Sequence, residues 1–251
     1  LGVSYAHSQI NIIADAFRNL DIKGTSSVTS LNYRQPLLAT MHWQFSGVGA
    51  YSITDSTTNI SGKQIADTTT HSITLGGSLD HQTDGQRWNI TQLVTRLNSN
   101  EPMLGKTSFT STPGSAYLIQ RLWHSRWALR ADVGWQWSTG ENIPSANLFQ
   151  IGGTGSVRGY QRGILSGPRG YYLDLELHRS VLERLDLFGF IDHGQIRAFY
   201  PNKDQISGAG LGGIYRHGWF SASADIAKPF NTVIPDQDSI RVDFRLAVHF
   251  N

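Results

Sequence analysis

The feature that most constrains this sequence is an alternation of apolar and polar residues with a period of two. Successive side chains of a β-strand point to opposite faces, so this period predicts strands. About twelve such runs follow one another, and none of the segments between them shows a convincing helical period. They cover residues 1–6, 31–33, 41–53, 72–80, 88–97, 117–123, 126–137, 171–178, 185–192, 208–215, 220–226 and 241–250. We therefore predict an all-β, antiparallel fold of about twelve strands.

The connections between these runs are expected to alternate between short and long. Short turns are expected around Pro36, Asp84, His124, Leu182 and His217. Long connections are expected around Asn19, Asn59, Glu101, Gly155, Asn202 and Pro235, including a polar loop over residues 54–67 and a loop containing Pro102 and Pro113. Outer-membrane barrels alternate in this way between periplasmic turns and extracellular loops. The pattern therefore favours a transmembrane barrel.

Aromatic residues gather near the ends of the predicted strands. The set comprises Trp123, Trp127, Trp135, Trp137, Tyr171, Trp219 and Phe250. Aromatic girdles of this kind lie at the two interfaces of a membrane. The apolar sides of the strands would face lipid and the charged sides a wet interior, and closure leaves no unpaired edge in hydrocarbon. A soluble β-sandwich or lectin-like fold remains the alternative, because its buried faces alternate too.

Composition excludes several functional classes. Without cysteine there are no disulfides and no thiolate metal sites. The net charge of +2, with no run of Lys or Arg, gives no reason to expect a nucleic-acid partner. The nine histidines show no metal-binding spacing on one face. We therefore expect no metal and no cofactor.

The longest irregular segment contains three glycines within four residues, followed by Val157, Arg158, Gly159 and Tyr160. A phosphate cradle would need a strand before this run and a helix after it, and the sequence supplies no helix. Residues 155–159, Gly-Ser-Val-Arg-Gly, mimic the Gly-x-Ser-x-Gly pattern of a hydrolase with the serine one position early, and that pattern needs the same context. We therefore expect that the protein is not an enzyme. An alternative for this segment is a flexible surface loop with an incidental arginine.

Several motifs occur in a fixed order along the chain. Residues 20–24 are Leu-Asp-Ile-Lys-Gly, the tetrad Val-Arg-Gly-Tyr follows at 157–160, and Gly-Pro-Arg-Gly-Tyr stands at 167–171. Residues 175–177 are Leu-Glu-Leu, and Phe190, Asp192 and Gly194 form a Phe-x-Asp-x-Gly motif. Together they resemble the TpsB transporters of two-partner secretion, a family of the superfamily that contains the barrel-assembly insertases. Two positions depart from the family pattern. Pro168 stands where the family often has an acidic residue, and Asn251 follows Phe250, whereas outer-membrane proteins commonly end on the aromatic residue.

The resemblance implies a sixteen-stranded barrel preceded by periplasmic POTRA domains. Residues 1–251 would be the C-terminal part of the barrel, with the POTRA domains and the first strands outside this chain. The implied function is a pore in the bacterial outer membrane that secretes a TpsA-type exoprotein, with both chain ends in the periplasm. The partner would be an adhesin, a cytolysin, a contact-dependent toxin or a haem-binding protein, and membrane lipid would surround the barrel. A passive porin and a barrel-assembly-type insertase are the alternatives.

In the family, the long loop folds back into the barrel and its arginine meets an acidic residue of the Phe-x-Asp-x-Gly strand. The resemblance therefore implies that loop 139–170 lies in the lumen, with Arg158 against Asp192. Alternation also places Asp192 and Glu176 on the inner face, so Glu176 is a second acceptor. Glycines 208, 210 and 212 would leave space beside them. Without the motif, Asp192 would be an ordinary solvated lumen residue.

Overall fold

The computed structural model describes residues 1–12, 22–101, 105–122, 126–140, 143, 147–197 and 205–248. The predicted connections around Asn19 and Asn202, the turn at His124, and residues Trp123 and Phe250 lie outside these ranges. The described strands are β1 (Gly2–Ile12), β2 (Ile22–Ala39), β3 (Trp43–Ile60), β4 (Lys63–Gln82), β5 (Gln86–Glu101), β6 (Gly105–Leu122), β7 (Trp127–Thr139), β8 (Phe149–Ile151), β9 (Leu165–Gly167), β10 (Arg169–Leu182), β11 (Leu185–Arg197), β12 (Gln205–His217), β13 (Phe220–Pro229) and β14 (Arg241–Val248).

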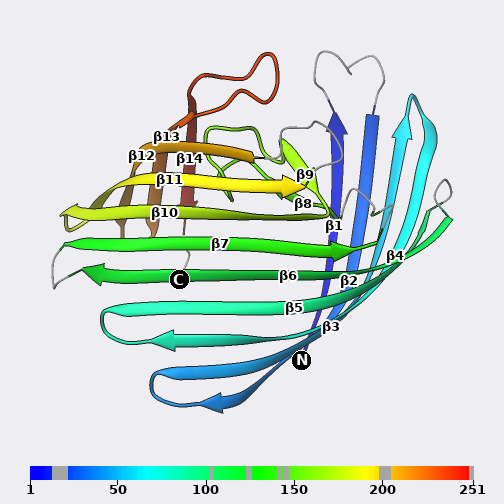
Figure 1. Ribbon diagram of the computed structural model, residues 1–251, viewed down its shortest axis with the longest axis horizontal. Coiled ribbons are helices and arrows are strands. Elements are labelled where there is room, and N and C mark those ends of the chain that lie inside the picture. The colour runs from blue at the N-terminus through cyan, green and yellow to red at the C-terminus, as the bar shows by residue number, and fades with distance from the viewer. Residues whose placement is uncertain are drawn as a thin grey trace.

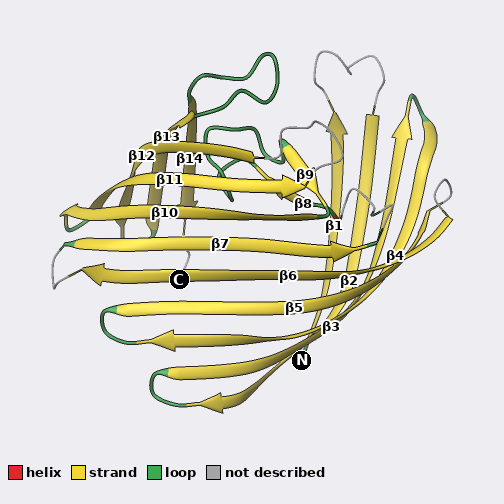
Figure 2. Cartoon of the chain, in the orientation of Figure 1, coloured by secondary structure: helices red, strands yellow, loops and turns green. Residues whose placement is uncertain are grey.

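Twelve of these strands form one antiparallel sheet, which confirms the predicted fold class and the number of strands in the sheet. Each strand pairs with its neighbour in sequence, except that β7 pairs with β10. Between them, β8 and β9 form a separate two-stranded hairpin. The sheet is strongly curved (Figure 1), and strands and loops make up the chain in Figure 2. None of the described elements is a helix long and apolar enough to span a membrane.

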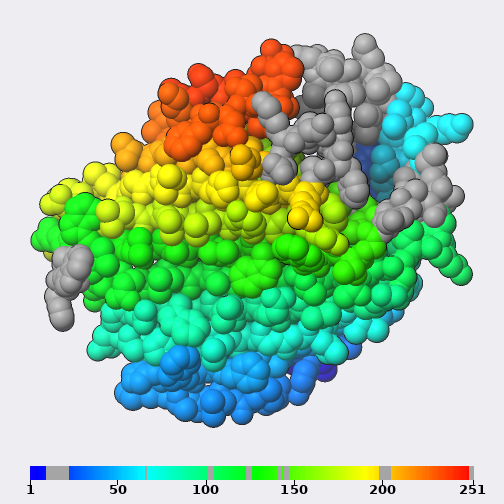
Figure 3. Space-filling view, viewed as in Figure 1, coloured from blue at the N-terminus to red at the C-terminus, as the bar shows by residue number. Residues whose placement is uncertain are grey.

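The two faces of the sheet differ as the alternation predicts. The inner face is the one that contacts the β8–β9 hairpin and its loop, and it contains the fully buried Asp192. The opposite face carries large apolar side chains that none of the described residues covers. Leu211, Val242 and Phe244 are each about two-thirds exposed there, at 67%, 67% and 66%. The space-filling view shows this outer surface running without a break across the middle strands (Figure 3). Such a face is suited to lipid.

The predicted long connections around Asn59 and Glu101 are wrong. β3 continues to Ile60 and β4 begins at Lys63, so Ser61 and Gly62, both with positive φ, form a two-residue turn. β5 and β6 are similarly separated by residues 102–104 alone. Residues 54–67 therefore belong largely to strands. They show no apolar alternation because polar side chains occupy both faces, whereas threonine itself favours the strand.

Hydroxyl ladders join these polar extensions. Thr25 and Thr57 are 2.6 Å apart at their Oγ1 atoms, and the hydroxyls of Ser26 and Ser56 are 3.0 Å apart. Cross-strand hydroxyl pairs of this kind contribute to sheet stability.

Pro36 and Pro113 both lie inside strands, although the sequence analysis expected Pro36 at a turn and Pro113 in a loop. Pro36 lies within β2, next to a register shift between Pro36 and Leu38. Pro113 lies within β6, where the pairing with β5 is interrupted between Gly114 and Ser111. Proline lacks an N–H, and such interruptions are where a sheet tolerates it. The predicted loop 139–170 is also slightly shorter, because Thr139 closes β7 and Arg169 opens β10.

The direction of the two faces predicts how the sheet responds to an added charge. We expect Val133→Arg in β7 and Leu246→Arg in β14 to destabilise the folded protein by about 2–4 kcal/mol, because both side chains point to the lipid face. Ser30→Arg in β2, which points to the inner face, is the matched control and should cost far less. Unfolding in denaturant, monitored by heat-modifiable gel mobility, measures the difference. Equal costs at all three positions would mean that the outer face does not meet lipid.

Candidate functional site

The connection between β7 and β10 folds onto the inner face of the sheet. Its tip is a compact turn in which the backbone N–H of Gly152 donates to Ser156 Oγ at 2.8 Å and that of Gly153 to the carbonyl of Val157 at 3.0 Å. Gly152 and Gly153 have φ of 110° and 86°, which residues with a side chain rarely adopt. Val157, Arg158 and Tyr160 are all buried. The segment is therefore a packed element and not a surface loop with an incidental arginine.

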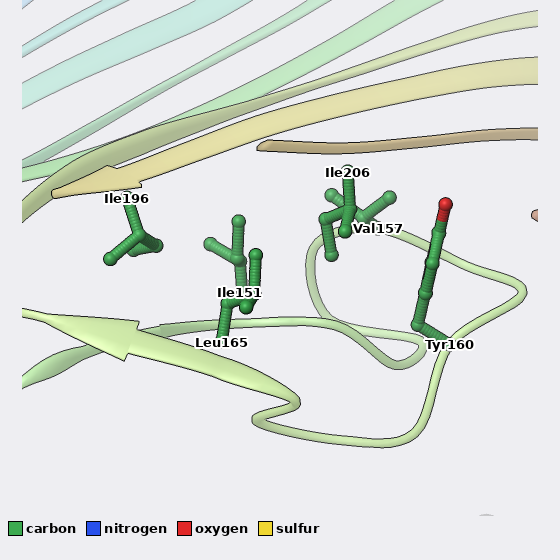
Figure 4. Close-up of a cluster of buried hydrophobic side chains, with 6 residues drawn as sticks. All are labelled: Ile151, Val157, Tyr160, Leu165, Ile196 and Ile206. Atoms are coloured by element: carbon green, nitrogen blue, oxygen red, sulfur yellow. The ribbon is translucent and has the colours of Figure 1, made fainter. Parts of the chain in front are cut away.

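An apolar cluster attaches this loop to the sheet (Figure 4). Ile151, Val157, Tyr160 and Leu165 come from the loop and its hairpin, and they pack with Ile196 of β11 and Ile206 of β12. All six side chains are at most 1% exposed. Burial on this scale stabilises by about 1.5–3 kcal/mol for each large side chain. The cluster fixes the loop on one side of Arg158.

Arg158 points from the loop into the sheet and makes a bidentate ion pair with Asp192 of β11. Its Nε donates to Oδ2 and its Nη2 to Oδ1 of Asp192, both at 2.8 Å, and the Arg158 backbone N–H donates to Oδ2 at 2.9 Å. Its Nη1 donates to Oε1 of Glu176 in β10 at 2.6 Å. The structure thus brings together the three residues that the sequence analysis grouped. Their role in function stays a prediction.

A third carboxylate, which the sequence analysis did not assign to Arg158, completes the site. Arg158 Nη2 donates to Oδ1 of Asp174 at 2.5 Å. Asp174 lies directly opposite Asp192 across the β10–β11 pair, and it shares the inward face with Glu176 two residues further along β10. That shared parity was the signal in the sequence that could have identified it.

The charge of Arg158 is almost fully removed from water, since its side chain is only 7% exposed. Burial alone would lower the pKa of Arg158, but the hydrogen bonds and charge of Asp192, together with the charge of Asp174 and the hydrogen bond to Glu176, raise it above its ordinary value. Glu176 also lies 3.9 Å from the Arg130 guanidinium, and His178 Nε2 lies 2.7 Å from its Oε2. The guanidinium therefore stays charged and is held by all three carboxylates.

Aromatic and glycine residues shape the space around the guanidinium. The Arg158 guanidinium carbon lies 3.5 Å from the centre of the Phe190 ring, a cation–π contact. Opposite Asp192, Phe190 and Phe188, strand β12 carries Gly208, Gly210 and Gly212. A Cβ at Gly208 would lie 2.5 Å from the carbonyl oxygen of Arg158, and one at Gly210 or Gly212 would meet a phenylalanine ring at 2.5 or 2.3 Å. Because these three glycines have no side chains, the loop and the two rings can lie directly against the backbone of β12.

Gly194, the last residue of the Phe-x-Asp-x-Gly motif, has a similar role on β11. A Cβ there would lie 2.9 Å from Cδ1 of Ile151 and 3.0 Å from Cγ2 of Val157. The motif thus provides a ring over Arg158, a carboxylate for its charge and a gap for the loop that carries it.

Tyr160, the last residue of the Val-Arg-Gly-Tyr tetrad, attaches the loop to β12 and to the β13–β14 connection. Its hydroxyl donates to the carbonyl of Ser207 in β12 at 2.8 Å and accepts from the backbone N–H of Asn231 at 3.2 Å. Asn231 belongs to the β13–β14 connection, which Gln237 braces by donating to the Asn231 carbonyl at 2.8 Å. Val233 of the same connection packs on the apolar cluster. The loop is therefore held by two strands and by a second loop.

A cavity of about 400 Å³ adjoins Arg158 on the inner side, lined partly by Arg130, Asp174, Glu176 and Asp225. Within the described ranges, no three His, Cys, Asp or Glu residues are placed to hold a metal ion. Ser156, the serine of the hydrolase-like pattern, accepts from the Gly152 amide inside the turn. The chemistry of this site is the binding of one guanidinium by several carboxylates.

Comparison with known proteins identifies the family. The model of the haemolysin secretion/activation protein family ShlB/FhaC/HecB matches residues 2–214. The chain therefore belongs to this family, as the motifs predicted, and its location is the bacterial outer membrane. No curated protein matches the sequence.

Two solved structures share the fold of this chain. CdiB from Acinetobacter baumannii matches with a TM-score of 0.78 and 18% sequence identity, over 98% of this chain and 47% of that one. CdiB from Escherichia coli matches with a TM-score of 0.78 and 20% identity, over 98% of this chain and 49% of that one. The chain thus spans about half the length of these two CdiB chains.

The glycine contacts predict which small substitutions displace the loop. We expect Gly194→Ala and Gly208→Ala to loosen residues 152–160, because each added Cβ would collide with the loop. The matched control is Gly189→Ala, also on β11, whose Cβ would have no neighbour nearer than 3.4 Å. Limited proteolysis of the purified protein, with cleavage sites mapped by mass spectrometry, measures the change. Equal protection of the loop in all three variants would show that the glycines do not seat it.

Proposed function

We propose that this member of the ShlB/FhaC/HecB family is the barrel part of an outer-membrane transporter that secretes a large exoprotein by two-partner secretion. The observation that supports the proposal best is the buried Arg158, held by Asp174, Glu176 and Asp192 on the inner face of the sheet. A loop that plugged the barrel permanently would be stabilised more by apolar packing. The favourable free energy of a buried ion pair is offset by the cost of removing its two charges from water. Polar contacts suit an element that is held in one state and displaced in another.

Under this proposal each motif residue has a definite task. Arg158 ties the loop to the wall of the barrel, Asp192 is its principal acceptor, and Glu176 and Asp174 share its charge. Val157 and Tyr160 dock the flanking backbone, and Gly159 lets it pass the edge of β13, where a Cβ would lie 3.0 Å from the amide nitrogen of Pro229. Phe190 and Gly194 shape the socket. The loop thereby occupies the interior until a secreted chain passes.

The partner is a TpsA-type exoprotein, and its class is one of adhesin, cytolysin, contact-dependent toxin or haem-binding protein. Capture of this partner falls to periplasmic POTRA domains outside residues 1–251, and four further strands complete a sixteen-stranded barrel. Two features support this division. The solved CdiB chains are about twice as long as this one, and the sheet of twelve strands ends in β1 and β14, which do not pair with each other in the described part of the chain.

The ion pair predicts a particular pattern of secretion defects. Arg158→Ala and Asp192→Ala in the full-length transporter should each abolish most secretion of the cognate exoprotein, because breaking a buried pair leaves an uncompensated charge and costs about 3–5 kcal/mol. The double variant should be little worse than either single one, since the two residues act together. Secreted protein in the medium is the measurement, with heat-modifiable mobility as the control for barrel assembly. Normal secretion by Arg158→Ala, or fully additive losses, would remove the ion pair from the mechanism.

The proposed orientation places the β4–β5 turn, the other turns at that end of the sheet and both chain ends in the periplasm, and the β3–β4 turn at the cell surface. A cysteine at Asn59, near the β3–β4 turn, should react with a membrane-impermeant maleimide on intact cells. A cysteine at Asp84, in the β4–β5 turn at the opposite end of β4, should react only after the outer membrane is permeabilised. The reverse pattern of labelling would invert the orientation and leave the fold unchanged.

A further inference from the structure

Strands β2 to β6 are longer than a membrane requires. They contain 16 to 20 residues each, whereas a tilted strand crosses the hydrocarbon in about 9–11. On the outer face, Ile73 and Leu75 of β4 and Val94 of β5 are exposed and apolar. Beyond Ile73 and Val94, towards the β3–β4 and β5–β6 connections, the same face becomes largely polar, with Ile65 near the β3–β4 turn as an exposed apolar residue. The sheet therefore continues past the apolar band at the end that carries these connections.

The polar part of this outer face contains a cluster of residues on three adjacent strands. Arg96 of β5 lies one outward position beyond Val94, and His71 pairs with Asn98, which in turn pairs with Ser108 of β6. One step further, Thr69 pairs with Asn100, and Asn100 with Lys106. The rows from Arg96 to Lys106 span about 13 Å along the strands, at about 3.3 Å per residue. We call this set the outer polar patch: Thr69, His71, Arg96, Asn98, Asn100, Lys106 and Ser108.

A cavity of about 500 Å³ lies in this patch, lined by residues that include His71, Asn98, Asn100, Lys106 and Ser108. Internal hydrogen bonds order its side chains. Ser108 Oγ donates to Asn98 Oδ1 at 2.9 Å, and Arg96 Nη1 donates to Thr110 Oγ1 at 3.1 Å. Tyr51 supports His71, since its hydroxyl lies 3.0 Å from Nδ1. Two carboxylates lie at the edge: Asp55 accepts from Thr69 Oγ1 at 2.7 Å, and the exposed Asp67 is the next outward residue of β4 beyond Thr69.

The ligand follows from the chemistry and the position of the patch. Two permanent cations, Arg96 and Lys106, stand about 13 Å apart among amides and hydroxyls, which is the mixture that binds sugar hydroxyls and phosphates. The patch faces outward directly beyond the lipid-facing residues, so the molecules nearest to it are lipid headgroups. In the proposed orientation this end is extracellular. The outer leaflet of a bacterial outer membrane there presents the phosphorylated saccharide of lipopolysaccharide.

We propose that the outer polar patch is a binding site for the phosphorylated saccharide headgroup of lipopolysaccharide. Arg96 and Lys106 bind its phosphates, while Asn98, Asn100 and Ser108 bind its sugar hydroxyls. The bound lipid stabilises the polar extensions of β4 to β6 against the surface of the membrane. This inference uses the proposed orientation and is independent of the role of Arg158.

The test uses the full-length protein in mild detergent, with binding of purified lipopolysaccharide measured by native mass spectrometry. Each cation near an anionic surface contributes about fivefold in affinity, so the double variant Arg96→Gln, Lys106→Gln should bind about twenty-five-fold more weakly. The matched control is Arg179→Gln in β10, which removes an exposed cation from the outer face at the opposite end of the sheet, where Arg179 stacks on Trp127. That variant should bind as the wild type does.

Two further probes identify the source and the chemistry of the ligand. Lipopolysaccharide from which the phosphates have been removed, and phosphatidylglycerol, should each bind the wild type as weakly as intact lipopolysaccharide binds the double variant. Undiminished binding by the double variant, an equal loss in Arg179→Gln, or equal binding of phosphatidylglycerol would each overturn the proposal. None of these readouts depends on secretion, so failure of the transport function and failure of this site are distinguishable.

Discussion

The burial of the Arg158 charge is the constraint on which the rest of the site depends. A guanidinium on the inner face is tolerated only where carboxylates replace its water, and here three do so. Those carboxylates come together because β10 and β11 are in a register that sets Asp174 against Asp192 and Glu176 against Phe190. A shift of either strand by one residue would turn the carboxylates of that strand to the lipid face. The strand register and the loop position therefore specify each other.

Space is the second requirement, and the glycines of β12 and β11 provide it. Phe188, Phe190 and Asp192 each face a glycine across the β11–β12 pair, so that two rings and the backbone of the loop fit against a strand with no side chains in the way. Gly194 does the same for Ile151 and Val157. The Phe-x-Asp-x-Gly motif and the alternating glycines of β12 are thus parts of one socket. Polar contacts and small residues together allow the loop that carries Arg158 to dock firmly and still to be displaced.

The sequence predicted the parts of this fold in which one face is apolar and the other polar. In β7, β10 and β11 the period of two gave both the strands and the direction of Asp192 and Glu176. The prediction failed in the outer halves of β3 to β6, because both faces there carry serine, threonine and asparagine and the period disappears. Strand register was also inaccessible from the sequence, so Asp174 was not assigned to Arg158. The number of carboxylates that hold one arginine depends on pairing across strands, which no local pattern reports.

The central claim is that the arginine holds the loop inside the barrel, and hydrogen exchange of the loop backbone tests it most directly. The Arg158 amide donates to Asp192, and the neighbouring amides close the turn at Gly152 and Gly153. In the full-length protein, peptides covering residues 152–160 should exchange as slowly as those of β10 and β11. In Asp192→Ala they should exchange rapidly while the strands stay protected. Rapid exchange of the loop in the wild type, or unchanged protection in the variant, would contradict the account.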